Sequence, residues 1–197
     1  MDKKILLSNS IRSQMTAPIH SLTVGNRIPK DYFVTKGKGE SNITIHAGSY
    51  HLALKNAGIE MCNIMTYSSI LPSIASEVEQ TSELVHGSVM ETIMAVANAE
   101  KGENATAGII YGWLYDRTTN DKYGGLVCEY NGSKPVKEVD EQLHDSLQEL
   151  YTNGFSDDYV LKDIRCITEN IIPEKEYGTA LVALCFINYI YPLIHGS

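Results

Sequence analysis

Residues 63–72 of this 197-residue chain have the sequence NIMTYSSILP, which is its most informative stretch. A pair of serines, Ser68 and Ser69, stands at the end of an apolar run, and Pro72 follows three residues after Ser69. By itself, a serine pair before a proline is typical of a junction between a strand and a turn. The segments on both sides of the stretch distinguish it from such a junction.

Upstream of the serine pair, residues 47–57 have the spacing of an amphipathic helix. One face consists of positions i, i+3, i+4, i+7 and i+10, namely Ala47, Tyr50, His51, Leu54 and Ala57. Gly58 follows, and glycine is favoured directly after the last helical residue. We therefore expect a helix here, with His51 facing inward or lining a pocket.

Before this helix, a short strand is expected over residues 32–35 and a loop over residues 36–42. The loop contains Gly37 and Gly39, but it lacks the third glycine and the following helix of a dinucleotide-binding loop. The two glycines are instead expected to let the backbone bend close to another segment. After the helix, residues 59–67 are expected to form a strand that leads into the serine pair.

A β-hairpin is predicted further along the chain. Residues 107–115 and 123–130 have the alternation of half-buried strands, and a polar connection joins them. On the return strand, Val127 and Glu129 share one face. The opposite face is formed by Leu126, Cys128 and Tyr130.

A second helix is predicted over residues 136–150, because it carries an apolar stripe of Val136, Val139, Leu143, Leu147 and Leu150. Residues 163–172 and 177–189 are expected to be strands, the last one buried on both faces. The pattern of residues 84–99 fits a strand imperfectly and a helix in part. Residues 1–30 are polar and are expected to form an extension, which leaves residues 31–197 as a single domain.

The composition limits the partners of the chain. A net charge of −8 leaves no basic surface to neutralise phosphates, so no nucleic-acid partner is expected. The four cysteines show neither Cys-x-x-Cys spacing nor a histidine cluster, which indicates buried free thiols in a reducing compartment and no metal site. Because signal-peptide and membrane-spanning patterns are also absent from the sequence, we expect a cytoplasmic protein without a membrane partner.

Taken in order, these features resemble the pyruvoyl-dependent arginine decarboxylases, from about Tyr32 to Tyr189. The set comprises the glycine-rich segment, the helix that ends near Gly58, then Asn63, Ser68-Ser69-Ile70-Leu71-Pro72 and Cys128-Glu129-Tyr130. The spacing between Asn63 and the serine pair is its most specific part. The resemblance implies an α/β fold, a four-layer αββα sandwich of mainly antiparallel sheets, in which residues 84–99 form a strand. It also implies a homotrimer with sites between subunits.

The resemblance further implies a cofactor made from the chain itself. The hydroxyl of Ser69 would attack the carbonyl of Ser68 and replace the peptide bond by an ester, for which the planar peptide must be held in a strained turn. Elimination would cut the chain between the two serines, and hydrolysis would leave a pyruvoyl group at residue 69. Such a ketone forms a Schiff base with an amino acid and accepts the electrons released with carbon dioxide. The implied reaction converts the small molecule L-arginine to agmatine.

Two further residues receive roles from the resemblance. Asn63 matches the family's active-site asparagine, whose amide can polarise the attacked carbonyl and hydrogen-bond the substrate carboxylate. Glu129 matches the glutamate that returns a proton to the carbon left by carbon dioxide. Without the resemblance, Asn63 can equally be interpreted as an amide that caps backbone groups at a strand end. The alternative for Glu129 is a solvated residue on an edge strand.

His51 departs from the family, which typically carries there an aspartate that helps to hold the guanidinium group of the substrate. A histidine cannot form the bidentate carboxylate–guanidinium pair. Either another carboxylate takes over this contact, such as Glu40 or one from a neighbouring subunit, or the substrate is a different amino acid. A further alternative is an unprocessed, inactive homologue that serves as a structural or small-molecule-binding subunit.

Overall fold

The computed structural model of the chain describes residues 24–80 and 84–193. Most of the polar extension predicted over residues 1–30 lies outside the described residues. The chain divides into a large unit, Ile28–Ile190, and a small one formed by Met1–Arg27 and Tyr191–Ser197. In the described part of the small unit, Val24 forms an isolated antiparallel bridge with Leu193. The sheets and helices that follow belong to the large unit.

One sheet of the large unit has five strands in the order β3-β6-β10-β2-β5. Their bounds are β2 (Asp31–Ser41), β3 (Asn63–Thr66), β5 (Ser76–Glu77), β6 (Val89–Glu100) and β10 (Tyr177–Phe186). The long strand β10 pairs antiparallel with β2 and β6, whereas the short strands β3 and β5 pair in parallel with β6 and β2. Burial of β10 along nearly its whole length confirms the prediction made from its apolar run.

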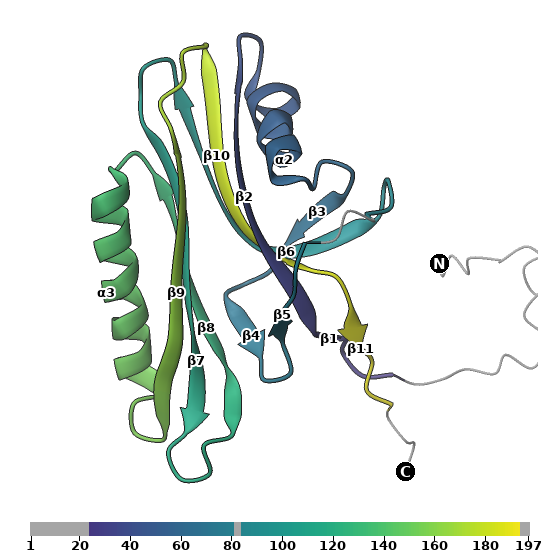
Figure 1. Ribbon diagram of the computed structural model, residues 1–197, viewed down its shortest axis with the longest axis vertical. Coiled ribbons are helices and arrows are strands. Elements are labelled where there is room, and N and C mark those ends of the chain that lie inside the picture. The colour runs from purple at the N-terminus through teal and green to yellow at the C-terminus, as the bar shows by residue number, and fades with distance from the viewer. Residues whose placement is uncertain (1–23, 81–83, 194–197) are drawn as a thin grey trace, which may run out of the picture. The chain divides into compact units, whose positions relative to one another are not determined.

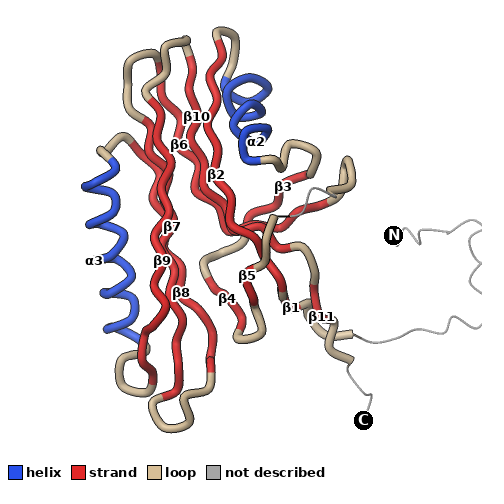
Figure 2. The backbone as a smooth tube through the Cα atoms, viewed as in Figure 1, coloured by secondary structure: helices blue, strands red, loops and turns tan. Residues whose placement is uncertain are grey.

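The second sheet has four antiparallel strands in the order β4-β8-β7-β9. Its centre is the predicted hairpin, β7 (Ala105–Asp116) and β8 (Lys122–Gly132). The strand β9 (Tyr159–Ile171) lies beside β7, and β4 (Ile70–Pro72) lies beside β8. Figures 1 and 2 show the two sheets facing each other.

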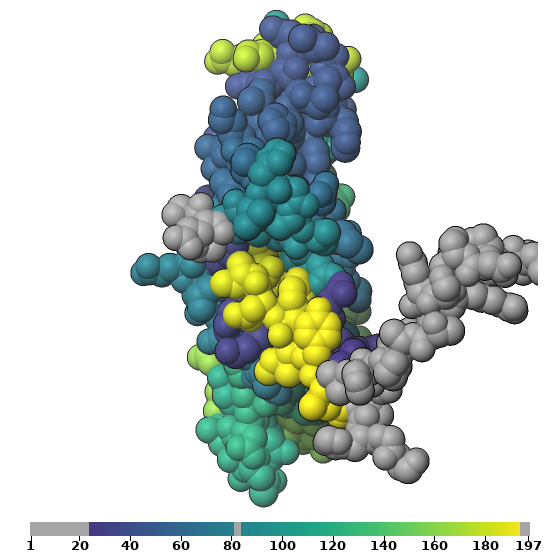
Figure 3. Space-filling view, turned by 90° about the vertical axis from the view of Figure 1, so that its right-hand side faces the viewer, coloured from purple at the N-terminus to yellow at the C-terminus, as the bar shows by residue number. Residues whose placement is uncertain are grey.

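The first and last strands of the large unit form a separate two-stranded ribbon. It consists of β1 (Ile28–Pro29) and β11 (Tyr189–Ile190), which pair antiparallel. Figure 3 shows the face on which these segments from opposite ends of the sequence lie side by side. The ribbon thereby joins the beginning and the end of the unit.

A hydrophobic core fills the space between the two large sheets. It includes Ile93 and Val182 from the five-stranded sheet and Ile109 and Val127 from the four-stranded sheet. Because side chains alternate along a strand, the neighbouring residue Leu126 faces away from this core. Leu126 instead packs with the next helix, so the predicted division of the β8 side chains between two faces is confirmed.

The helix α3 (Val136–Gly154) covers the four-stranded sheet (Figure 1). Three members of the predicted apolar stripe, Val139, Leu143 and Leu147, are buried there against Ile110 and Leu126. The periodicity of the sequence therefore predicted both the helix and the face that it buries.

The helix α2 (His51–Ala57) packs against the five-stranded sheet, and it follows a π-helical turn, η1 (Ile45–Tyr50). In this turn the amide of Ser49 bonds to the carbonyl of Thr44, five residues earlier. The wider turn changes which positions face the sheet, so Ser49 and Ala53 are buried while Ala47 and His51 are exposed. At the other end, Gly58 closes the helix with a φ of +72°, as the sequence predicted.

The loop predicted over residues 36–42 is wrong, because β2 continues as a strand to Ser41. Its glycines do pass close to another segment, as expected. A Cβ atom on Gly37 would lie 2.3 Å from the carbonyl oxygen of Ala53, and one on Gly39 would lie 2.5 Å from that of Ser49. Close packing against η1 and α2 thus explains both glycines without a bend.

Three other expectations have clear outcomes. The strand predicted over residues 84–99 is confirmed as β6, whereas that over residues 59–67 shortens to β3. The cysteines are free, with Cys62 and Cys185 buried and the other two half-buried. Within residues 24–80 and 84–193, no helix has the length and apolar character needed to cross a membrane.

Candidate active site

The segment from Tyr67 to Ile70 passes from one sheet to the other (Figure 1). On the five-stranded sheet, the amide of Tyr67 donates to the carbonyl of Thr92 in β6, at 2.7 Å. On the four-stranded sheet, the carbonyl of Ser69 accepts a hydrogen bond of 3.3 Å from the amide of Val127 in β8. The bond between Ser68 and Ser69 therefore lies between two anchors on different sheets.

A tight turn surrounds this bond. The amide of Ile70 donates to the carbonyl of Ser68 at 3.0 Å, which makes Ser69 the central residue of a γ-turn. The same carbonyl is the one that the Ser69 hydroxyl is predicted to attack, and an amide donor on it would stabilise the charge that develops there. Ser69 is not among the described residues with positive φ, so left-handed strain is not what holds the predicted scissile bond.

The side chain of Ser69 contacts Glu129. Its hydroxyl lies 2.7 Å from both carboxylate oxygens of Glu129, to which it donates. Glu129 is half-buried in β8, on the same face as Val127 and toward the neighbouring sheet. A carboxylate in this position can accept the proton of the hydroxyl, which makes the oxygen a better nucleophile. The structure thus brings together two predicted site residues that are 60 positions apart.

Asn63 is not part of this contact within the chain. It is the first residue of β3, and the three-residue rise to Thr66 places it about 10 Å along the strand from the turn. Its side-chain amide donates to the carbonyl of Gly87 at 2.9 Å, and its side chain is exposed. The described contacts therefore match an amide that caps a loop, and the predicted active-site role of Asn63 stays a prediction.

Glu40 lies far from the serine pair within the chain. Its carboxylate accepts hydrogen bonds from the backbone amides of Glu174 and Lys175, at 2.7 and 3.0 Å. The serine segment lies near the other end of β2, because Tyr67 packs against Phe186 and Phe186 packs against Tyr32. Tyr32 and Glu40 are eight positions apart on this strand, or about 26 Å. A surface cavity of about 910 Å³ is also lined by Glu40, and no residue of the serine segment or of β8 lines it.

His51 lines a different surface cavity, of about 500 Å³, which is the second of the two predicted placements. The cavity also contains Glu60, a half-buried carboxylate that the sequence did not single out. None of the residues lining it comes from the turn or from β8, so within one chain this cavity is separate from Ser69. The full lining is His46, Ala47, Tyr50, His51, Leu54, Glu60 and Cys62.

A second carboxylate, to which the sequence assigned no role, is Glu91. It is 2% exposed, lies in β6, and accepts a hydrogen bond from the hydroxyl of Tyr67, directly before the serine pair. The available signal was a glutamate within the apolar run of residues 84–99. That signal became interpretable only once the pairing of β3 with β6 placed the run beside the serine segment.

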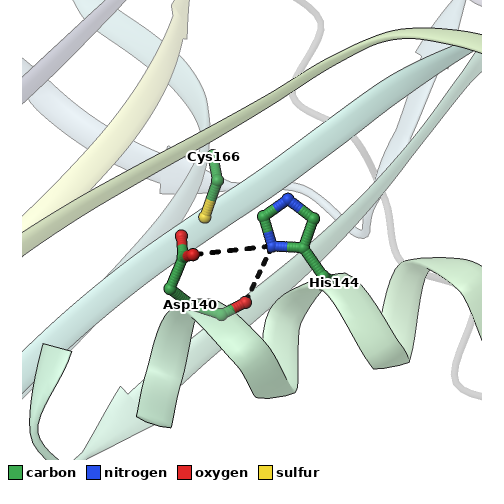
Figure 4. A group of neighbouring side chains, drawn as sticks. All are labelled: Asp140, His144 and Cys166. Atoms are coloured by element: carbon green, nitrogen blue, oxygen red, sulfur yellow. Dashed lines mark hydrogen bonds and ion pairs between the residues drawn. The ribbon is translucent and has the colours of Figure 1, made fainter. Parts of the chain in front are cut away.

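A third group of side chains lies between α3 and β9 and consists of Asp140, His144 and Cys166 (Figure 4). Their potential ligand atoms lie within 4.8 Å of one another. However, Nδ1 of His144 is already 2.8 Å from the carbonyl oxygen of Asp140 in the preceding turn. Burial raises the pKa of the Cys166 thiol to about 12, which disfavours the thiolate that a metal requires. These contacts are those of a helix face, and we assign them no chemistry.

The site around Ser69 defines a class of protein. A serine hydroxyl held by a carboxylate, next to a hydrogen-bonded carbonyl of its own backbone, is equipped to rearrange the peptide bond before it. A family model of pyruvoyl-dependent arginine decarboxylases matches residues 31–191, and the chain belongs to this family. The match confirms the resemblance inferred from the serine pair and its surroundings.

Individual relatives carry the same name. The chain is 34% identical over 160 residues to "Pyruvoyl-dependent arginine decarboxylase 1" of Archaeoglobus fulgidus, which covers 79% of this chain and 96% of that protein. It is 29% identical over 187 residues to "Pyruvoyl-dependent arginine decarboxylase AaxB" of Chlamydia muridarum, covering 84% and 94%. A match of 41% over 86 residues to the enzyme of Methanococcoides burtonii covers 42% of this chain and 47% of that protein.

The family is one of carboxy-lyases with a covalently bound pyruvoyl cofactor. The residues present fit this group. Ser69 could supply the attacking hydroxyl and the carbon atoms from which a pyruvoyl group is made, and Glu129 offers a carboxylate in direct contact with that hydroxyl. The chemistry of the donor set therefore agrees with the family.

Proposed function

We propose that this chain is a self-processing pyruvoyl-dependent decarboxylase that cuts itself between Ser68 and Ser69 and converts L-arginine to agmatine and carbon dioxide. The observation that carries the proposal is the contact of the Ser69 hydroxyl with Glu129, beside the carbonyl of Ser68 that the amide of Ile70 already polarises. The family and its named relatives supply the reaction class and the substrate.

The proposed cleavage has three stages, which are ester formation, elimination and hydrolysis. Glu129 accepts the proton of the Ser69 hydroxyl while the oxygen attacks the carbonyl carbon of Ser68. The carbon–nitrogen bond then breaks and the nitrogen of Ser69 takes up a proton, which leaves an ester between the two residues. Removal of the Ser69 α-proton expels Ser68 as a carboxylate, and hydrolysis of the resulting dehydroalanine releases ammonia. Fragment 69–197 then begins with the pyruvoyl group.

After cleavage, Glu129 no longer has the Ser69 hydroxyl as its partner. The pyruvoyl group supplies the electron sink for the departure of carbon dioxide from an amino acid. Glu129 stands beside this position and, when protonated, can deliver its proton to the carbon that has lost carbon dioxide. One side chain thus serves first as the base of cleavage and then as the acid of decarboxylation. Asn63 lies about 10 Å from the turn at Ser69 within the chain, so the proposal assigns its amide to the substrate carboxylate at a site formed between subunits.

The guanidinium group of the substrate requires a carboxylate, and the position of His51 does not supply one. Glu60 lines the same cavity as His51, whereas Glu40 is hydrogen-bonded to the 174–175 backbone. Glu60 is therefore the better candidate for this contact. Because the cavity is separate from Ser69 within one chain, the proposal needs the cavity of one subunit to face Ser69 of the next.

A homotrimer with sites between subunits meets this need. Support comes from large apolar side chains that are exposed on β3, on β4 and around the start of β6, where they are available to an interface. They are Met65, Ile70, Val85 and Val89, which are between 52% and 72% exposed. The arrangement of α2, two sheets and α3 likewise supports the four-layer αββα sandwich of the family, and the free thiols support a cytoplasmic location.

The test is carbon dioxide release from a panel of amino acids, measured on the wild type, Glu60→Gln and His51→Asp. We expect the wild type to prefer arginine, Glu60→Gln to lose arginine turnover, and His51→Asp to keep it. A wild type that ignores arginine while His51→Asp accepts it would show that residue 51 directs the enzyme to another amino acid. Absence of turnover on every amino acid would favour the unprocessed, inactive homologue.

A further inference from the structure

Tyr67, the residue directly before the serine pair, is fixed to β6 at two points. Its backbone amide donates to the carbonyl of Thr92 at 2.7 Å, and its hydroxyl donates to the carboxylate of Glu91. Its ring also packs against Phe186, with 5.7 Å between the ring centroids. Consecutive residues of one strand therefore hold both the backbone and the side chain of Tyr67.

The carboxylate in this arrangement is buried on the side of β6 that faces the core between the sheets. Glu91 is 2% exposed and belongs to the same face of β6 as Ile93, which lies in the core between the sheets. Burying a carboxylate is costly unless hydrogen bonds compensate, and replacing such a group by a well-packed apolar one is often neutral or stabilising. The hydrogen bond from the Tyr67 hydroxyl offsets part of this cost, and it fixes the Tyr67 side chain against β6.

The anchor at Tyr67 has a counterpart on the other side of the scissile bond. The carbonyl of Ser69 is held by Val127, and Ile70 pairs with Leu126 in the neighbouring sheet. Ser69 is two positions after Tyr67, a span of at most about 7 Å. A displacement at Tyr67 would therefore reach the carbonyl of Ser68. Reactions that depend on a near-attack arrangement lose about 10²-fold in rate from a misplacement of about 1 Å.

We infer that Tyr67 and Glu91 are a positioning pair for self-cleavage, which holds the Ser68 carbonyl in place while the Ser69 hydroxyl attacks it. The inference rests on the proposed function, since it assumes that the chain cuts itself. The pair acts through the backbone of residues 67 and 68, because its described hydrogen bonds reach neither the Ser69 hydroxyl nor the Ser68 carbonyl. It adds an upstream anchor to the machinery formed by Ser69, Glu129 and Ile70.

The experiment follows cleavage of newly synthesised full-length chains over time, by gel and by mass. Tyr67→Phe keeps the ring and removes the hydroxyl, so cleavage should slow by about 10²-fold. Glu91→Leu should slow it similarly, whereas Glu91→Gln should cleave close to the wild-type rate, because an amide oxygen still accepts the Tyr67 hydroxyl. The matched control is Tyr115→Phe, which removes a hydroxyl that bonds to Asp163 at 3.0 Å on the same sheet as β8. Its cleavage should equal that of the wild type.

Melting temperatures of the same variants separate positioning from a loss of stability. A positioning role predicts that Tyr67→Phe cleaves far more slowly than Tyr115→Phe even when both melt at similar temperatures. Equal cleavage rates of Tyr67→Phe and the wild type would overturn the inference, and so would a Glu91→Gln variant as slow as Glu91→Leu. A wild-type chain that stays uncut would instead overturn the proposed function itself.

Discussion

Replacing Glu129 by glutamine tests the assignment of the base in self-cleavage. Both carboxylate oxygens lie 2.7 Å from the Ser69 hydroxyl, and the amide of glutamine keeps one oxygen that can accept this hydrogen bond. The hydroxyl therefore stays in place while its proton loses its acceptor. General bases contribute about 10²–10⁴-fold to a rate, which corresponds to about 3–5 kcal/mol in the barrier.

We expect cleavage of Glu129→Gln to slow by about 10²-fold, the lower end of the range for general bases, because the hydrogen bond that positions the hydroxyl is retained. The assay is the uncut fraction of purified chain against time, with Glu141→Gln as control. Glu141 forms an exposed pair with Lys137 at 4.0 Å, and such a pair contributes at most about 0.5 kcal/mol. Cleavage of Glu129→Gln at the wild-type rate would refute the role of Glu129 as the base. The part of the Glu129→Gln protein that does cleave should also turn over arginine about 10²-fold more slowly than the wild type.

Two further predictions concern the fold. Gly37→Ala places a Cβ atom 2.3 Å from the Ala53 carbonyl oxygen and should lower the free energy of unfolding by about 1–3 kcal/mol in urea titrations. The control is Gly154→Ala in α3, where the space around the new Cβ atom is open. It should leave the free energy of unfolding unchanged or raise it by up to about 1 kcal/mol. Burial raises the pKa of the Cys166 thiol from 9.0 to about 12, so the unfolded chain ionises first and the free energy of unfolding should fall as pH rises from about 9 toward 12. Other thiols and phenols whose pKa values burial raises, such as Cys185 and Tyr111, contribute to the same slope, so replacing Cys166 by alanine should make the slope shallower by the share of one thiol. An unchanged slope would contradict the assignment to Cys166.

Hydrophobic patterns within a single stretch of sequence predicted the helix α3 and the strands β7 and β8 well. The stripe of α3 and the alternation of β7 and β8 follow directly from burial of one face. The strand β2 was missed beyond residue 35 because glycines and lysines are typical of loops. In the fold, Gly37 and Gly39 are required by the backbone of η1 and α2, a contact that sequence spacing does not reveal.

The exposure of His51 had a similar cause. The π-helical turn of η1 inserts an extra residue before α2, so a face drawn with ordinary helical spacing assigned Ala47 and His51 to the inside. Ser49 is buried instead, and its hydroxyl lies 2.8 Å from that of Thr179 in β10. The burial of Ser49 against Thr179 is a tertiary contact, which the local sequence does not display.

The candidate site was predictable only in part, for the same physical reason. The serine pair and Glu129 belong to the ordered set of residues that resembles the family, and the structure brings Ser69 and Glu129 into contact. Glu60 and Glu91 gain their meaning from the residues that surround them in space. Glu60 shares a cavity with His51, and Glu91 meets Tyr67 through the parallel pairing of β3 with β6. Contacts of this kind depend on sheet pairing, which a single sequence does not specify.

The mass of the purified, folded protein tests the central claim most directly. We expect the wild type to consist of two fragments, residues 1–68 and 69–197, with a carbonyl group that reacts with hydrazides at the beginning of the second. Ser69→Ala lacks the attacking hydroxyl and should remain a single chain without this group. A folded wild-type protein that keeps its full-length mass and does not react with hydrazides would contradict the account.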